Sequence, residues 1–236
     1  MKAARYLPAC AAAIAAVLAA APAEAQRTGS RIGRDATASD AGAAMQLVAE
    51  CLVERRPELV KRLFRTLPGS TEESSMLSRQ EGDLGICMED PQLVLDGKQL
   101  RFKGRAIRTP LAKALIRKML PSASAVGPAA PGSDPWFLAP YSALPPKAAV
   151  SRQHLNLLDF GHCVATTNWP ATRAFLMAAP ASAEESTAVK KLVPVLGPCL
   201  LEGMTVQLTS SVLRDALAEP VYQILMNPTS NLVAVN

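Results

Sequence analysis

Two histidines and a carboxylate between them are the first residues in this 236-residue chain that could do chemistry. His154 and His162 are its only histidines, and Asp159 precedes His162 by three residues, a spacing at which helical side chains can meet. A histidine beside a carboxylate is a common form of general base. Two histidines eight residues apart, however, make a poor metal site. We therefore expect both to lie at the surface or to pack between helices, and we predict neither a metal nor another cofactor.

Two pairs of glutamates could serve as the acid and the base of a glycosidase-like enzyme. Glu72-Glu73 and Glu184-Glu185 are neighbours in sequence, however, and neighbouring side chains on a helix point apart. Residues 70–73 and 182–185 also fit a capping box, in which serine accepts from the third amide and glutamate reaches back. We assign the glutamates to capping and solvation. Nucleophile motifs and phosphate-binding glycine loops are absent from the sequence, so we predict no catalytic residue.

A run of cations without an acidic residue lies near the middle of the chain. Its members are Lys98, Arg101, Lys103, Arg105, Arg108, Lys113, Arg117 and Lys118. Such a face could hold an anionic partner, such as lipid headgroups, an acidic protein or a polyanion. The plainer interpretation is a solvated surface, because charge runs usually are. Nucleic acid is not expected as the partner, since aromatic stacking positions are not interleaved with the charges.

Arg108 and Arg214 occupy matching places at the start of a predicted helix. The helix dipole disfavours a cation there, so each arginine should have a defined partner. We expect that partner to be a carboxylate or a carbonyl of the same part of the chain, because the guanidinium offers a fork of donors.

Four cysteines form two pairs with the same separation. Cys51 and Cys87 are 36 residues apart, and so are Cys163 and Cys199. Of the three possible pairings, only Cys51–Cys87 with Cys163–Cys199 treats both pairs alike. A zinc site is conceivable, but the chain has no C-x-x-C spacing among them. We therefore predict two disulfides.

The cysteines are landmarks of a longer internal repeat. A shift of 112 residues aligns 48–88 with 160–200 without a gap, and a shift of 106 then continues the alignment past Arg108 and Arg214. We predict two tandem, pseudo-equivalent units, residues 41–120 and 151–236, packed into one body or loosely jointed. Residues 121–150, rich in proline and alanine, form the connector. Its aromatic residues, Trp136, Phe137 and Tyr141, predict that part of it packs on a unit.

Local patterns within each unit predict an all-α, mainly helical fold. A stripe of apolar residues at helical spacing, Ala44, Leu47, Val48, Cys51 and Leu52, indicates a first helix with the cysteine facing the core. Pro57 and Pro170 suit the first turn of a second helix. The capping boxes begin a third helix, which should stop at Gly85 or Gly197.

A fourth helix closes each unit. In the first unit it begins near Thr109-Pro110, and in the second Pro220 should kink or shorten it. Between the third and fourth helices, residues 93–102 alternate in hydropathy around Asp96-Gly97, which predicts a possible short β-hairpin.

The first residues of the chain have the pattern of a signal peptide. A basic start, an apolar run and Ala23-Glu24-Ala25 predict cleavage after Ala25. Residues 26–40 should be a disordered leader. The apolar run is shorter than the ~20 residues that span a bilayer, so we predict no transmembrane segment. Export to an oxidising compartment also favours disulfides, which predicts a periplasmic or secreted protein.

The order of these landmarks resembles uncharacterised exported proteins of alphaproteobacteria. The shared features are a cysteine before a proline-started helix, the run Pro-Gly-Ser-x-Glu-Glu at 68–73, Gly-x-Cys, and Leu/Ile-Arg followed by Leu-Ala. The resemblance covers both units and implies export and the repeat, but no activity. We therefore predict a non-enzymatic binding or envelope-structural protein, with a small periplasmic hydrolase carrying an unrecognised acid/base site as the alternative.

Overall fold

A computed structural model describes residues 38–79, 81–88, 104–123, 133–145, 147–203 and 208–226. Within these ranges the chain forms ten α-helices, two short 3₁₀ turns and no strand, which confirms the predicted all-α class. The helices are α1 (Ala38–Arg55), α2 (Pro57–Leu63), α3 (Thr71–Ser78), α4 (Glu81–Met88), α5 (Arg108–Met119), α6 (Leu138–Ser142), α7 (Arg152–Thr167), α8 (Trp169–Met177), α9 (Ala183–Cys199) and α10 (Ser210–Met226). The possible β-hairpin at 93–102, the predicted signal peptide and residues 26–37 of the predicted leader lie outside the described residues. Residues 38–40, predicted to be disordered, belong to α1.

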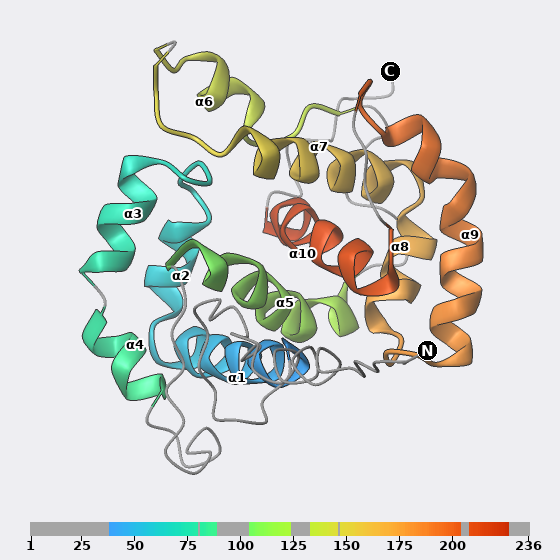
Figure 1. Cartoon of the computed structure of the whole chain (residues 1–236). Coiled ribbons are helices and arrows are strands. Elements are labelled where there is room, and N and C mark those ends of the chain that lie inside the picture. The colour runs from blue at the N-terminus through green and yellow to red at the C-terminus, as the bar shows by residue number, and fades with distance from the viewer. Residues whose placement is uncertain are drawn as a thin grey trace, which may run out of the picture. The chain divides into compact units, whose positions relative to one another are not determined.

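Four helices stack in the order α1, α5, α10, α7 (Figure 1). The first two belong to the predicted unit 41–120 and the other two to 151–236. Leu52 of α1, Leu111 of α5, Leu217 of α10 and Phe160 of α7 are buried in one hydrophobic cluster. Since burial of apolar side chains is the main favourable term in folding, this shared core holds the two units together. They form one body rather than a loosely jointed pair.

The remaining helices flank this stack. Helices α2 and α4 pack on α1, whereas α8 and α9 pack on each other and on α7. The connector also packs: Phe137 forms a second, smaller apolar cluster with Leu67, Leu155 and Leu158. Trp136 and other partly buried connector residues lie against this cluster, which confirms that part of the connector packs on a unit.

The predicted helix starts are largely confirmed, and two predicted helix ends are wrong. In the first unit the third helix ends earlier than predicted, at Ser78, and a separate helix, α4, runs through Gly85 to Met88. In the second unit α9 runs through Gly197 to Cys199. Neither glycine adopts the positive φ of a helix-ending residue. The second cysteine of each pair therefore lies within a helix, Cys87 in α4 and Cys199 at the end of α9.

Pro220 lies inside α10, which continues through it to Met226, so the proline does not shorten the helix. A proline has no N–H to donate to the carbonyl four residues earlier, here that of Ala216. At this point α7 passes very close to α10. A Cβ added at Gly161 of α7 would collide with the Ala216 carbonyl oxygen and lie 2.9 Å from Cγ of Pro220. The tight α7–α10 contact therefore requires a glycine.

Replacing Gly161 with alanine is expected to lower the free energy of unfolding by about 1–3 kcal/mol, because α7 and α10 must move apart. Gly197→Ala is the matched control. A Cβ there meets nothing within 4 Å, so it should raise stability by about 0.5–1 kcal/mol through helix propensity. Urea denaturation followed by circular dichroism measures both effects. Equal stability of the two variants would show that α7 and α10 are not closely packed at this point.

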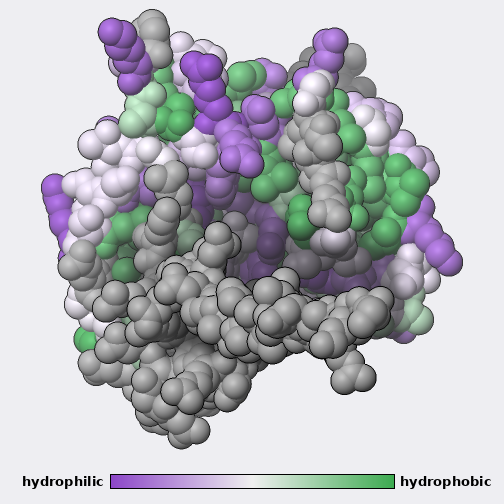
Figure 2. All heavy atoms as spheres, in the orientation of Figure 1, coloured by the Kyte–Doolittle hydropathy of each residue, from purple (hydrophilic) through white to green (hydrophobic). Residues whose placement is uncertain are grey.

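Some large hydrophobic side chains remain exposed on the second unit. Met177 at the end of α8 is 48% exposed, and Val193 on α9 is 57% exposed. Figure 2 shows hydrophobic side chains gathered on the right of the view, the side on which Figure 1 draws α9. Exposed apolar groups in one area often mark a binding surface.

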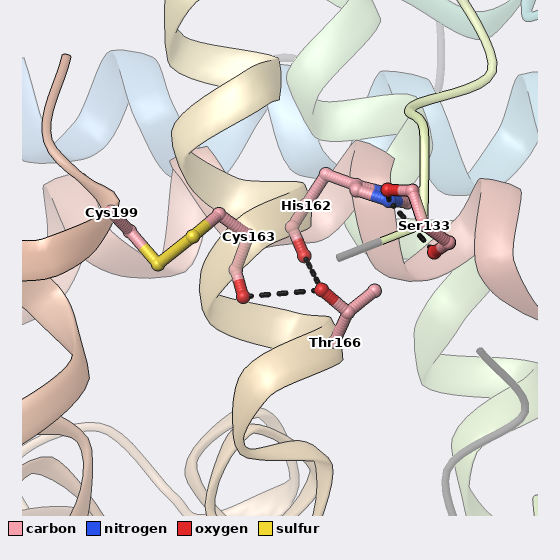
Figure 3. Close-up of a disulfide and its surroundings, with 5 residues drawn as sticks. All are labelled: Ser133, His162, Cys163, Thr166 and Cys199. Carbon is pink, nitrogen blue, oxygen red and sulfur yellow. Dashed lines mark hydrogen bonds between the residues drawn. A yellow bond between two sulfur atoms is a disulfide. The ribbon is translucent and has the colours of Figure 1, made fainter. Parts of the chain in front are cut away.

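Both predicted disulfides are present. Cys51–Cys87 joins α1 to α4, and Cys163–Cys199 joins α7 to the last residue of α9 (Figure 3). The Cα–Cα distances are 5.7 and 5.6 Å, in the usual range for a disulfide. Two such bonds suggest an oxidising, extracytoplasmic location. In the part of the chain that the structure describes, no helix is long and apolar enough to cross a membrane.

Candidate functional site

Arg108, the first residue of α5, lies at the centre of a buried cluster of charges and is 1% exposed. Its Nε and Nη2 donate to the carboxylate of Glu219, at 2.8 and 2.6 Å, and its Nη1 donates to Oε1 of Glu73 at 2.8 Å. The carbonyl oxygens of Leu63 and Thr66 accept from Nη1 and Nη2. All five N–H groups of the guanidinium therefore have protein acceptors, and none is left for a ligand.

Glu73 reaches Arg108 because it also caps α3. The Glu73 amide donates to Oγ of Ser70 at 3.1 Å, and the Gly69 amide donates to Oε2 of Glu73. This confirms the predicted capping box, except that the glutamate receives the amide one residue before the N-cap. Gly69 has a φ of 77°, which turns its N–H toward the carboxylate. The second glutamate oxygen is then free to accept from Arg108.

The second unit contains the same set of contacts. The Glu185 amide donates to Ser182, the Ala181 amide donates to Glu185, and Nη2 of Arg214 donates to Oε1 of Glu185 at 2.7 Å. Arg214 also donates to the carbonyls of Leu176 and Ala178. Each arginine thus binds a carboxylate and carbonyls of its own unit, as predicted. The capping-box glutamates are structural anchors for these arginines.

One residue in this second set is strained. Ala181 has a φ of 61°, where its counterpart in the first unit is Gly69. A left-handed conformation costs a residue with a Cβ roughly 1–2 kcal/mol. This backbone conformation directs the Ala181 amide at the Glu185 carboxylate, and the resulting hydrogen bond offsets the strain.

Ala181→Gly is expected to raise the free energy of unfolding by about 1 kcal/mol by relieving this strain. The converse change, Gly69→Ala, should destabilise by at least as much, because the new Cβ would also lie 2.8 Å from the Ser151 amide nitrogen. Thermal melts of the two variants test the pair. An Ala181→Gly variant less stable than the parent would contradict the strain.

Glu219 of α10 is what makes the first cluster different, because it comes from the other unit. Burial raises the pKa of Glu219, but the nearby Arg108 and His154 outweigh it, and the pKa lies below its ordinary value. Burial likewise lowers the pKa of Arg108, while Glu219 and Glu73 raise it above the ordinary value. Both groups are therefore charged at neutral pH. A carboxylate held ionised by an arginine is a poor proton donor, so this cluster is suited to joining the units.

The two histidines do not come together. His154 of α7 lies at the edge of the cluster, with Nε2 3.5 Å from Oε2 of Glu219, and its side chain is 25% exposed. His162 is buried, and its Nε2 lies 2.8 Å from the carbonyl oxygen of Ser133 in the connector (Figure 3). Burial lowers the pKa of His162, opposed by the Ser133 hydrogen bond and by Asp159, so the ring is neutral at neutral pH. His162 therefore fastens the connector to α7.

Asp159 interacts with His162 electrostatically, and burial raises the pKa of its carboxyl group. Across the described ranges, no three histidine, cysteine, aspartate or glutamate side chains are grouped as a metal site.

The predicted basic face is altered by the fold. Arg108 is not on the surface, which is a correction: as the first residue of α5, it points into the joint between the units. The last three cations each meet a carboxylate, in the pairs Lys113–Asp215 (2.9 Å), Arg117–Glu50 and Lys118–Glu54 (3.1 Å). Lys98, Arg101 and Lys103, together with the side chain of Arg105, lie outside the described residues. An anionic partner for the seven cations other than Arg108 stays a prediction.

A groove of about 420 Å³ lies between α8 and α9. Small and apolar residues form most of its wall, and two charged residues of α9 lie along it: the lining includes Pro170, Ala171, Ala174, Glu184, Ala188 and Lys191. Asn168 holds the walls together, since its Oδ1 accepts from the Ala171 amide and its Nδ2 donates to the Lys191 carbonyl at 3.1 Å. Sequence reasoning missed this groove.

A signal for the groove is nevertheless present in the repeat. The shift of 112 residues places Arg62 opposite Ala174 and Met76 opposite Ala188, so large side chains in one unit correspond to alanines in the other. Comparison with known proteins adds no assignment: no family model, no curated protein and no solved structure matches this chain. The site is therefore interpreted from its own geometry.

Proposed function

We propose that this chain is an exported, non-enzymatic protein of the bacterial envelope that acts by binding a partner or as a structural component. The signal-peptide pattern supports export to the periplasm or the medium, with cleavage after Ala25. The two disulfides support the same compartment. The resemblance to exported alphaproteobacterial proteins agrees with this proposal.

The main support for a non-enzymatic function is that the buried charged side chains already bind one another and the backbone. Arg108 binds Glu73, Glu219 and two backbone carbonyls, and all three side chains are buried. A catalytic acid or base needs a proton-transfer position open to substrate. These side chains are 1–2% exposed, so they serve the joint between the units.

We also propose that the two units arose by duplication of one disulfide-stapled unit. Equivalent disulfides, capping boxes and carboxylate-bound arginines in the two halves support this origin. Binding would then have developed on the second unit, which carries the groove between α8 and α9 and the exposed Met177 and Val193.

Expression of the full chain in a bacterium, followed by fractionation, tests export. The expected product is an envelope or extracellular protein that begins at Gln26. A protein that stays in the cytoplasm with its first residues intact would overturn the proposal.

Photo-crosslinking in intact cells tests binding. A photoreactive amino acid replaces Val193, which is exposed on α9 of the second unit, and the control replaces Glu72, which is exposed on α3 of the first unit. We expect a discrete adduct with an envelope component at position 193 only. Equal labelling from both positions, or no adduct from either, would count against binding on the second unit.

A further inference from the structure

We propose that the groove between α8 and α9 binds a short peptide with free termini, about three residues long, whose amino group meets Glu184 and whose carboxylate meets Lys191. This inference rests on the proposed binding function of the second unit and names the ligand class for the groove between α8 and α9.

The two charged residues set the length and direction of the ligand. Glu184 and Lys191 are both exposed, both line the groove and lie seven residues apart on α9, which is two helical turns or about 10 Å. An extended peptide spans about 3.3–3.6 Å per residue, so three residues match this distance. The opposite charges at the two positions complement a zwitterion and select its orientation. The Glu184 carboxylate is ionised at neutral pH, because hydrogen bonds from its own amide and from Ser182 lower its pKa.

The wall between these two charges suits the body of such a peptide. Pro170, Ala174 and Ala188 offer a shallow apolar surface without bulky side chains, which leaves room for a backbone and small side chains. At the end of the groove near Lys191, the Asn168 side chain accepts from the Ala171 amide and donates to the Lys191 carbonyl. This hydrogen bond joins the two walls near Lys191 and so fixes the distance between them there.

The comparison between the units shows that two alanines of the groove are replaced by larger residues in the first unit. At the positions of Ala174 and Ala188 the first unit has Arg62 and Met76, whereas the acidic position is kept as Glu72. The corresponding helical region in the first unit is also divided into α3 and α4, whereas α9 is continuous. Replacing Ala174 with the arginine found at the corresponding position of the first unit should therefore fill the groove.

Titration of the mature, oxidised protein with trialanine, followed by amide NMR and calorimetry, tests the inference. We expect saturable shifts at residues 168–191 with trialanine and none with N-acetyl-trialanine amide, in which both charges are blocked. Glu184→Gln and Lys191→Gln should each weaken binding about fivefold, the size of a partly exposed ion pair. Glu72→Gln, the matched change in the first unit, should leave the affinity unchanged.

Ala174→Arg places the side chain of the first unit into the groove and should abolish binding. Ala174 is exposed, so the fold should tolerate the change, and the melting temperature verifies this. The inference is overturned if the blocked peptide binds as tightly as trialanine, if Ala174→Arg binds normally, or if no peptide binds. In the last case a crosslinked adduct at position 193 would still uphold the proposed function, so the two failures are distinguishable.

Discussion

Arg108→Met is expected to lower the free energy of unfolding by about 3–5 kcal/mol, the cost of removing one partner from a buried ionic cluster. Arg108 neutralises Glu73 and Glu219, which are both about 2% exposed and lie 2.8 and 2.6 Å from its guanidinium. Methionine fills much of the volume but leaves two buried carboxylates without a counter-charge. It also leaves the carbonyls of Leu63 and Thr66 without their donor. Chemical denaturation at neutral pH measures the loss.

The second unit provides the control for this experiment. Arg214 binds one carboxylate, that of Glu185, and its side chain is 16% exposed, so water can replace part of what is lost. Arg214→Met should therefore cost less, about 1–3 kcal/mol, as for a hydrogen-bonded charged group. Adding Glu219→Gln to Arg108→Met should recover part of the stability, because one of the two uncompensated charges is removed. If Arg108→Met were no more costly than Arg214→Met, the cluster would not be the joint between the units.

Removal of the first disulfide, by Cys51→Ala with Cys87→Ala, is expected to lower the free energy of unfolding by about 3–4 kcal/mol. The bond closes a chain separation of 36 residues, and the loss comes mainly from greater freedom of the unfolded chain. The double change avoids a free thiol. Differential scanning calorimetry of the oxidised protein measures it.

Cys163→Ala with Cys199→Ala is the matched variant, because that bond closes the same separation. We expect a similar loss, and in both variants a single melting transition, since the two units share one core. Two separate transitions would show that the units unfold independently. An unchanged melting temperature would show that packing alone maintains the helices that the bonds connect.

The α8–α9 groove shows why part of the candidate site could not be predicted. Alanines at 174 and 188 are typical of any helix and do not indicate by themselves that the facing helix leaves space. Whether they form a contact or a groove depends on the distance between α8 and α9. That distance is set by the packing of both helices and by the hydrogen bond from Asn168 to the Lys191 carbonyl. These two residues are 23 positions apart in the sequence.

The sequence by itself determined the features that depend on local spacing or on symmetry between the units. The disulfide pairing followed from two equal separations, and the starts of α3 and α9 followed from serine and glutamate three residues apart. The capping contacts join residues within one helical turn. The disulfides follow from the requirement that both units pair their cysteines in the same way, so the pattern of residues is sufficient to predict both.

Only the tertiary structure decided which elements of the two units meet. Glu219 lies 111 residues from Arg108, and the pattern of α10 marks neither its burial nor its partner. Gly161 is required where α7 passes Pro220, a crossing that depends on how both helices are seated in the core. Long-range pairs of this kind arise because a shared hydrophobic core fixes where helices cross, and many crossings are compatible with the same apolar stripes.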